Sequence, residues 1–324
     1  MKIAALVTRC VGNRCQVMDR EGRLYEAMIK GNLRIKGIRS TNPIVVGDSV
    51  LLSINDGSNA AQGSEDFPAV IESIAPRHNY IIRKSINLSK ESHILAANID
   101  LAYLLVTLVP PATSFTFVDR FLATAEAYNI KTQLLFNKID LYGGDYLADL
   151  CYWEALYQGI GYTTHRISAT KGIGITTLLD ESKGKIVLLS GHSGVGKSSL
   201  INSMIPGSNL ATASLSEAHQ TGMHTTTVAE LIPLGKTPAE GFLIDTPGIK
   251  GFGTLEMDAS NAWHYFPEIF QISQACRFHN CTHRGEPGCA VVAAVHDQRI
   301  APSRYQSYLS ILQDAESGKY RPPQ

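Results

Sequence analysis

Nine consecutive residues near the middle of the chain have the types and spacing that hold a phosphate group. Gly191, Gly196, Lys197 and Ser198 fit the pattern G-x-x-x-x-G-K-[ST] between an apolar stretch and a helical one. Glycines let backbone N–H groups curl around a phosphate, a lysine reaches its outer oxygens, and a serine hydroxyl can bind Mg²⁺. A chance glycine-rich turn is the alternative. The expected phosphate-binding residues are Gly191, His192, Ser193, Gly194, Val195, Gly196, Lys197, Ser198 and Ser199.

A second motif, Asp245-Thr-Pro-Gly248, closes the apolar stretch at 242–244. A carboxylate there can hold the shell of a Mg²⁺ ion, and the Gly248 N–H can be donated to a γ-phosphate. Alone, this motif is also typical of an ordinary turn. Together with the phosphate loop, it predicts a magnesium shell formed by Ser198 and Asp245.

A third group of residues has the chemistry to recognise guanine. The Asp140 carboxylate can accept hydrogen bonds from N1–H and the exocyclic amine, which adenine does not present in that form. Asn137 would lie beside the base carbonyl, Lys138 would pack its stem over the ring, and a backbone N–H after Ser168 could be donated to the guanine oxygen. A helix-start turn is the alternative for this motif. The expected base-binding residues are Asn137, Lys138, Ile139, Asp140, Ser168 and Ala169.

These four motifs follow the ends of predicted strands, and open α/β sheets bind ligands at that edge. The expected strands are 101–109, 133–136, 165–168, 186–189 and 242–244, and the expected helices are 117–128, 146–157, 175–181 and 197–204. This alternation predicts a doubly wound parallel sheet. The nucleotide bound at its edge is predicted to be GTP, accompanied by Mg²⁺.

A cysteine cluster near the C-terminus has the spacing of a structural metal site. Cys276, Cys281, His283 and Cys289 offer three thiolates and one imidazole, which suit a closed tetrahedral Zn²⁺ site. Unligated buried cysteines are the alternative, and His279 is a rival ligand on spacing alone. The remaining cysteines, Cys10, Cys15 and Cys151, are expected to be small core residues.

The N-terminal region has a different sequence pattern, with short apolar stretches separated by turn residues. Short strands are expected at 3–11, 15–19, 24–29, 45–54 and 69–74, and five strands with hairpin turns suit a small barrel. Residues 1–84 carry 12 Lys and Arg against 8 Asp and Glu, and Lys30, Arg34, Lys36 and Arg39 fall in a stretch without acids. A solvated loop and a contact with a nucleic-acid backbone both explain such a stretch.

The whole chain has 324 residues with 29 basic and 29 acidic side chains, 44% hydrophobic and 18% charged. This composition is typical of a globular protein and argues against extensive disorder. The longest apolar run, 101–109, is far shorter than the ~20 residues that span a bilayer, and the N-terminus lacks a secretory apolar region. We therefore expect a cytoplasmic protein without a membrane partner, and we assume a monomer.

The order of the motifs carries a family resemblance. The guanine motifs at 137–140 and 168–170 precede the phosphate loop at 191–199, and the Asp245–Gly248 motif comes last, which resembles the circularly permuted GTPases. With the N-terminal barrel and the cysteine cluster, the chain is similar to the family of small-ribosomal-subunit-dependent GTPases, RsgA or YjeQ. The resemblance implies an OB-fold β-barrel (1–74), an α/β circularly permuted P-loop GTPase domain (75–253) and a small helix-rich zinc-binding domain (254–324). It assigns one structural Zn²⁺ to the four residues of the cysteine cluster.

The segment before residue 228 corresponds to switch I, where a threonine completes the magnesium shell. Thr225 or Thr226 is expected to do so, and Met223 stands where the family commonly has arginine. Ile249 occupies the position of the water-orienting glutamine of Ras-like enzymes, so intrinsic hydrolysis should be slow. His224 is the nearest group able to orient or deprotonate water, although a solvent-facing loop histidine is the alternative.

The resemblance implies a ribosome-stimulated GTPase that converts GTP to GDP and phosphate, binds 16S rRNA and assists late maturation of the 30S subunit. Two alternatives remain: a GTP-gated RNA-binding module that does not need hydrolysis, and a GTPase acting on another RNA. Because the chain runs from Gly248 through 251–253 into the terminal domain, γ-phosphate contacts are also hypothesised to move that domain.

Overall fold

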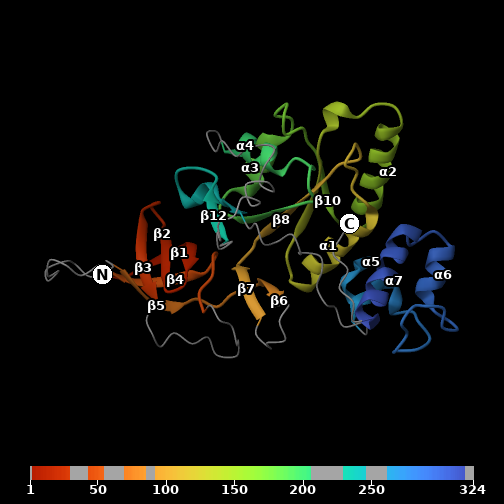
Figure 1. Cartoon of the computed structure of the whole chain (residues 1–324). Coiled ribbons are helices and arrows are strands. Elements are labelled where there is room, and N and C mark those ends of the chain that lie inside the picture. The colour runs from red at the N-terminus through yellow and green to blue at the C-terminus, as the bar shows by residue number, and fades with distance from the viewer. Residues whose placement is uncertain are drawn as a thin grey trace. The chain divides into compact units, whose positions relative to one another are not determined.

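The computed structural model describes residues 2–29, 43–54, 69–84, 92–205, 229–245 and 261–317. The chain divides into two compact units, and Figure 1 labels the helices and strands. The first comprises Met1–Ala102, Gly174–Leu189 and Ser198–Ile249, and the second comprises Tyr103–Ile173, Ser190–Lys197 and Lys250–Gln324.

Five strands of the first unit form a closed barrel. They are β1 (Lys2–Val11), β2 (Arg14–Asp19), β3 (Leu24–Ile29), β4 (Ser49–Ile54) and β5 (Ala69–Ile74). The pairing runs β1–β2–β3–β5–β4 and closes from β4 to β1, with β3 and β5 parallel. Inward-facing Val7, Val17, Leu52 and Ile71 are fully buried in its core. This is the predicted OB-fold barrel.

The rest of the first unit supplies the strand that leads into the phosphate loop. A hairpin joins β6 (Tyr80–Lys84) to β7 (Ser92–Ala97), and β11 (Ile186–Ser190) runs parallel to β13 (Phe242–Asp245). β12 (Glu230–Pro233) is antiparallel to β13 and meets β1 of the barrel at one pair, Arg9 and Glu230. The helices are α3 (Ile175–Ser182) and α4 (Lys197–Met204), with the short 3-10 turn η2 (Pro238–Glu240).

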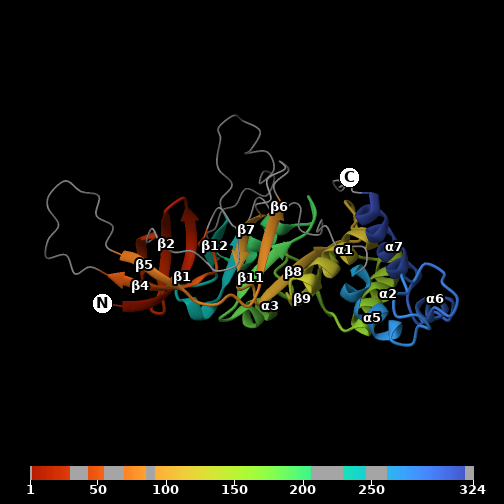
Figure 2. The same ribbon diagram turned by 90° about the horizontal axis from the view of Figure 1, so that it is seen from below.

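The second unit combines three neighbouring strands of the sheet with helices. The order of these strands is β10 (Thr163–Arg166), β9 (Thr132–Phe136), β8 (Leu101–Val106), with β9 and β10 parallel. Its helices are α1 (Phe115–Ala127), α2 (Asp145–Ile160), α5 (Pro267–Ser273), α6 (Ala290–His296) and α7 (Pro302–Ser317), with the 3-10 turns η1 (Ile139–Leu141) and η4 (Ala262–Tyr265). Figure 2 shows α7 beside α1, and their shared apolar core includes Ala123, Phe266 and Tyr308.

Several predicted elements differ from those observed. The strand expected to reach Val109 stops at Val106, because the turn before α1 is closed by a hydrogen bond from the Thr113 N–H to the Thr107 carbonyl, 2.8 Å. The strand expected at 165–168 lies at 163–166 and is mostly exposed, since β10 is at the edge of the sheet. Hairpin β6–β7 and strand β12 were not expected, and β12 adds an antiparallel strand.

The three isolated cysteines behave differently from one another. Cys15 is buried in the barrel core, as predicted. Cys10 lies opposite it on β1 and is joined to it by a disulfide, which was not expected. The prediction was wrong for Cys151, which is exposed on α2. In the part of the chain that is described, no helix combines the length and apolar character needed to traverse a membrane.

Candidate functional site

The phosphate loop lies between β11 and α4, where the strand–loop–helix pattern predicted it. Gly196 has φ +104°, and a Cβ atom there would lie 2.4 Å from Asn137 Nδ2, so only glycine fits. Lys197 starts α4, and its ammonium donates to the carbonyls of Gly191 (2.5 Å) and His192 (2.7 Å). Helix α4 therefore begins with a cation held over the loop, which is the arrangement that binds anionic oxygen.

His192 fixes the phosphate loop to the start of helix α1. Its Nδ1–H donates to the Ser193 carbonyl (2.9 Å), which leaves Nε2 to accept from the Thr113 hydroxyl (2.7 Å). The Thr113 oxygen in turn accepts from the Thr107 N–H (3.0 Å), and the Phe117 ring meets the imidazole edge-on. Burial lowers the pKa of His192, so the neutral ring that this pattern requires is favoured.

Asn137 joins three loops through one buried side chain. Its amide nitrogen donates to the Val195 carbonyl in the phosphate loop (2.9 Å), and its amide oxygen accepts from the Ala169 N–H (3.1 Å). Asn137 is only 2% exposed. The structure shows its amide bonded to the phosphate loop and to the loop after β10. The position beside the base carbonyl stays a prediction.

The remaining base-directed residues lie around Asn137. Ser168 is fully buried and donates its hydroxyl to the Asp140 carboxylate, 2.5 Å. Asp140 itself is exposed in η1, and Lys138, in the left-handed conformation, precedes it and reaches toward the Pro110 carbonyl (3.5 Å). A carboxylate anchored by a buried serine and open to solvent can accept hydrogen bonds from a ligand.

The structure describes only part of the magnesium and switch residues. Ser198 and Ser199 are half-buried in the first turn of α4. The backbone of Asp245 ends β13, next to β11. The predicted residues His224, Thr225, Thr226 and Gly248 lie outside the described residues, as do the cations at 30–39.

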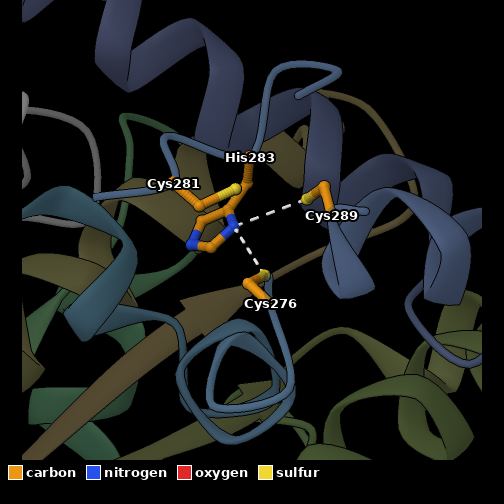
Figure 3. Close-up of side chains that lie close together, drawn as sticks. All are labelled: Cys276, Cys281, His283 and Cys289. Carbon is orange, nitrogen blue, oxygen red and sulfur yellow. Dashed lines mark hydrogen bonds between the residues drawn. The ribbon is translucent and has the colours of Figure 1, made fainter. Parts of the chain in front are cut away.

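The four predicted metal ligands come together in the C-terminal part of the second unit (Figure 3). The sulfur atoms of Cys276, Cys281 and Cys289 and an imidazole nitrogen of His283 lie within 4.8 Å of one another. The His283 Nδ1 is 3.6 Å from Cys276 Sγ and 3.6 Å from Cys289 Sγ. Zn–S bonds of about 2.3 Å and Zn–N bonds of about 2.0 Å in a tetrahedron give S···N separations of about 3.5 Å, close to those observed. The donor set therefore fits such an ion, and the rival His279 is exposed and outside this cluster.

The chemistry of the cluster also favours a cation. Burial raises the pKa of the Cys281 thiol to about 12 and raises that of Cys289, and burial lowers the pKa of His283. Three thiolates packed this closely are costly unless a positive ion lies among them. A divalent metal would displace the thiol protons and offset that cost.

Hydrogen bonds hold the backbone around the cluster. Glu286 accepts from the backbone N–H of Thr282 (2.6 Å), Arg284 (2.8 Å) and Gly285 (3.2 Å). Burial acts to raise the pKa of Glu286, but these bonds and the Thr282 hydroxyl lower it to about 2. From α7, the Tyr308 hydroxyl donates to the Thr282 carbonyl (2.8 Å). The loop that carries the ligands is thus held by one carboxylate and one helix.

A buried ion pair, which the sequence did not predict, connects the region of the cysteine cluster to α1. Arg304 of α7 is 1% exposed and donates to Asp119 of α1 (2.7 Å) and to Glu268 of α5 (2.7 Å). Tyr157 of α2 donates to the same Asp119 oxygen (2.8 Å), and the guanidinium lies over the Phe266 ring. Burial alone would lower the pKa of Arg304, but the two carboxylates raise it above its ordinary value. One sequence signal was available: Asp119 interrupts the apolar face of α1.

Comparison with known proteins gives concordant matches. The model of the RsgA GTPase family matches residues 74–255. The small ribosomal subunit biogenesis GTPase RsgA of Bacteroides fragilis (strain YCH46) is 52% identical over 316 residues, covering 98% of both chains. The protein of the same name from Porphyromonas gingivalis (strain W83) is 52% identical over 317 residues, again covering 98% of both.

Two solved structures share the fold. The crystal structure of YjeQ from Thermotoga maritima superposes with a TM-score of 0.76 at 31% identity and covers 99% of this chain and 100% of its own. The crystal structure of YloQ, a circularly permuted GTPase, has a TM-score of 0.73 at 24% identity and covers 99% of this chain and 97% of its own. The second likeness concerns the fold alone.

Proposed function

We propose that this chain, which belongs to the RsgA GTPase family, uses GTP hydrolysis to assist late maturation of the small ribosomal subunit. Its enzymatic activity is the hydrolysis of GTP, and its motifs are circularly permuted. The proposed partner is 16S rRNA in the 30S subunit, and the proposed location is the cytoplasm, where small subunits assemble. We propose a monomer.

The hydrogen bonds of Asn137 are the observation that carries the nucleotide part of this proposal. The buried amide of Asn137 connects the phosphate loop at Val195 with the loop that holds Ala169. Asp140 follows Asn137 by three residues in the sequence. A ligand that fills this site needs a polyphosphate at one end and a hydrogen-bonding base at the other. GTP has both.

We assign the nucleotide contacts accordingly. Lys197 and the backbone of 191–196 bind the phosphates, and Ser198, Asp245 and either Thr225 or Thr226 surround Mg²⁺. Asp140 and the loop at 168–169 read the guanine edge, and Lys138 covers its face. Gly248 senses the γ-phosphate, and His224 orients the attacking water.

The domain assignment is also a proposal. We infer an RNA-binding barrel over 1–74, the GTPase domain over 75–253 and a zinc domain over 254–324. A single structural Zn²⁺ held by the cysteine cluster would supply rigidity and no chemistry, because four protein ligands leave no open position.

The test is GTP turnover with and without purified 30S particles, with ATP as the control nucleotide. We expect slow intrinsic turnover that 30S particles accelerate, within the range of about 10³–10⁵-fold that one supplied group can provide. His224→Ala should bind GTP and lose most of this acceleration. Full acceleration in that variant would move the role to the ribosome, and no acceleration of the unmodified protein would contradict the proposed function.

Two alternatives are separated by simple comparisons. If hydrolysis is incidental, a variant that binds but cannot hydrolyse GTP will restore subunit assembly in cells as well as the unmodified protein does. If another RNA is the target, co-sedimentation at fixed salt will favour free RNA or 50S particles over 30S, since nonspecific contacts weaken steeply as salt rises.

A further inference from the structure

The surface beside the metal cluster exposes aromatic rings. Phe270 of α5 is 42% exposed and Phe278, in the loop between Cys276 and Cys281, is 43% exposed. His264 of η4 is exposed as well, whereas the neighbouring Phe266 is fully buried. The region therefore has its own apolar core and also exposes aromatic rings to solvent. Packing in the core does not account for these exposed rings.

Exposed His264 and Phe270 pack against half-buried Trp263, which itself packs on the apolar core; we call these three rings the aromatic cluster. The Trp263 and His264 centroids are 3.7 Å apart with an interplanar angle of 26°, and Trp263 lies 5.7 Å from Phe270 at 20°. The His264 Nδ1–H donates to the Asn261 carbonyl (3.2 Å), which fixes the orientation of the imidazole. Trp263 also meets His283 of the cysteine cluster edge-on, with the ring centroids 5.5 Å apart. The aromatic cluster is therefore fixed to the metal-binding loop.

Charge around the aromatic cluster indicates the chemistry of its partner. Residues 261–289 contain two carboxylates, Glu268 and Glu286, and both are engaged within the protein. Glu268 is bound to buried Arg304, and Glu286 accepts hydrogen bonds from the ligand loop. Arg277, by contrast, is exposed and lies over the Phe278 ring at 5.4 Å. Within residues 261–289, exposed rings thus occur together with an exposed cation, and both carboxylates of this stretch are engaged.

A second exposed apolar surface in the same unit differs in charge. Leu141, Leu147 and Tyr152 are 46–61% exposed there, but Asp145 and Asp149 lie among them and are exposed too. Such a surface repels phosphate. It serves as an internal comparison, because it has exposed rings without the electrostatics that a nucleic acid requires.

We propose that the aromatic cluster, together with Arg277 and Phe278, binds unpaired bases of RNA by stacking. Every base offers a π-face, and an adjacent arginine can contact the phosphate or stack on a base. This inference deepens the proposed role on ribosomal RNA and rests on it. It predicts a preference for single-stranded over double-stranded RNA, because paired bases cannot reach the rings.

The experiment uses a fluorescein-labelled 12-nucleotide single-stranded RNA and a blunt 12-base-pair duplex, titrated with the full-length, metal-loaded protein at one salt concentration. Trp153→Phe leaves Trp263 as the sole tryptophan, so its emission reports this site alone even if the barrel also binds RNA. We expect the single strand to quench Trp263 emission and the duplex to leave it unchanged. The combined variant His264→Ala and Phe270→Ala should weaken binding of the single strand about tenfold or more.

Tyr152→Ala is the matched control, because it removes an exposed ring from the acidic surface and should leave RNA affinity unchanged. Phe270→Tyr should retain most of the affinity, since it preserves the ring. Metal content, measured by chelator release, must be equal in all variants, which excludes unfolding of the zinc domain as the cause.

Three outcomes would overturn the inference. The first is Trp263 emission in the Trp153→Phe protein that does not change when single-stranded RNA is added. The second is a combined variant that binds this RNA and co-sediments with 30S as well as the parent protein does. The third is a combined variant that keeps its RNA affinity but loses 30S co-sedimentation. The last outcome would identify a protein contact. All are distinct from failure of the proposed function, which shows as absent 30S stimulation of GTP turnover in the unmodified protein.

Discussion

Replacing Asn137 by alanine tests whether the three loops around the nucleotide depend on one side chain. The substitution removes the donor to the Val195 carbonyl and the acceptor for the Ala169 N–H. Val195 and Ala169 are 0% and 4% exposed, so water has little access to the two groups left behind. Both loops should then lose their common anchor while the sheet beneath them remains intact.

The size of the effect follows from these two orphaned groups. A buried donor or acceptor left without a partner costs about 1–3 kcal/mol, so the pair costs about 2–6 kcal/mol. Because water can enter the space left by the deleted amide and bond to the two groups, we expect a cost at the lower end of this range. If nucleotide binding must restore the loops, about 2 kcal/mol corresponds to roughly 30-fold weaker binding. Because the loss concerns loop order, GTP and GDP should be affected alike.

The assay is equilibrium titration of Asn137→Ala with fluorescent GDP and GTP analogues. Asn79→Ala provides the matched control, because Asn79 makes two buried hydrogen bonds of 2.8 Å to Ile99 in the other unit. We expect both variants to be less stable to urea and only Asn137→Ala to bind nucleotide weakly. Unchanged nucleotide affinity in Asn137→Ala, or equal losses in both variants, would refute the reasoning.

Three further predictions concern other parts of the chain. Asp140→Asn should weaken GTP binding by about 10²-fold or more and improve binding of xanthosine triphosphate, since an amide can donate to the carbonyl that xanthine has in place of the guanine amine. Competition titration measures both affinities. An unchanged preference for GTP over xanthosine triphosphate would remove Asp140 from base recognition. Asp119→Ala should cost about 3 kcal/mol in unfolding free energy, the lower end for breaking a buried pair, because Arg304 loses one of its two carboxylates and keeps Glu268. Asp314→Ala breaks the partly exposed pair between Arg120 and Asp314 on the same two helices and should cost under about 1 kcal/mol. Equal costs in urea titration would contradict this. Glu286→Gln should lower metal affinity about 10–100-fold in chelator competition. Since hydrogen bonding lowers the pKa of Glu286 from 4.5 to about 2 in the folded protein, its stabilising contribution should be complete above pH ~5 and decline as pH falls toward 2, a dependence that the glutamine variant should lack.

Local patterns predicted most of the fold because local chemistry determines those elements. Helix α4 was predicted at 197–204 and is observed there. The prediction was possible because a glycine-rich phosphate loop is followed directly by a helix, which here begins at Lys197. The four cysteine-cluster residues were predicted as a group and lie within 4.8 Å of one another. In both cases, residues that act together are close in sequence, so spacing alone constrains their geometry.

The parts that were not predicted depend on partners distant in sequence. Arg304 and Asp119 are 185 residues apart, and Thr113 and His192 are 79 apart. Neither pair leaves a periodic signal, because each depends on how helices pack after the sheet has formed. The exposure of β10 has a similar origin: its sequence is compatible with burial, but its position at the sheet edge leaves one side uncovered.

Helix α1 shows why those unpredicted contacts matter for the site. Near its first turn, Thr113 and Phe117 contact His192 of the phosphate loop. One turn later, Asp119 binds Arg304, which belongs to the helix whose tyrosine holds the metal-binding loop at Thr282. The phosphate loop and the region of the cysteine cluster are therefore packed against the same helix, within one compact unit. A shift of the phosphate loop that moved α1 would have to move this region or break a buried ion pair, and the second option is costly. Coupling between nucleotide and C-terminal region thus has a described physical route through α1, in addition to the chain connection hypothesised at 248–253.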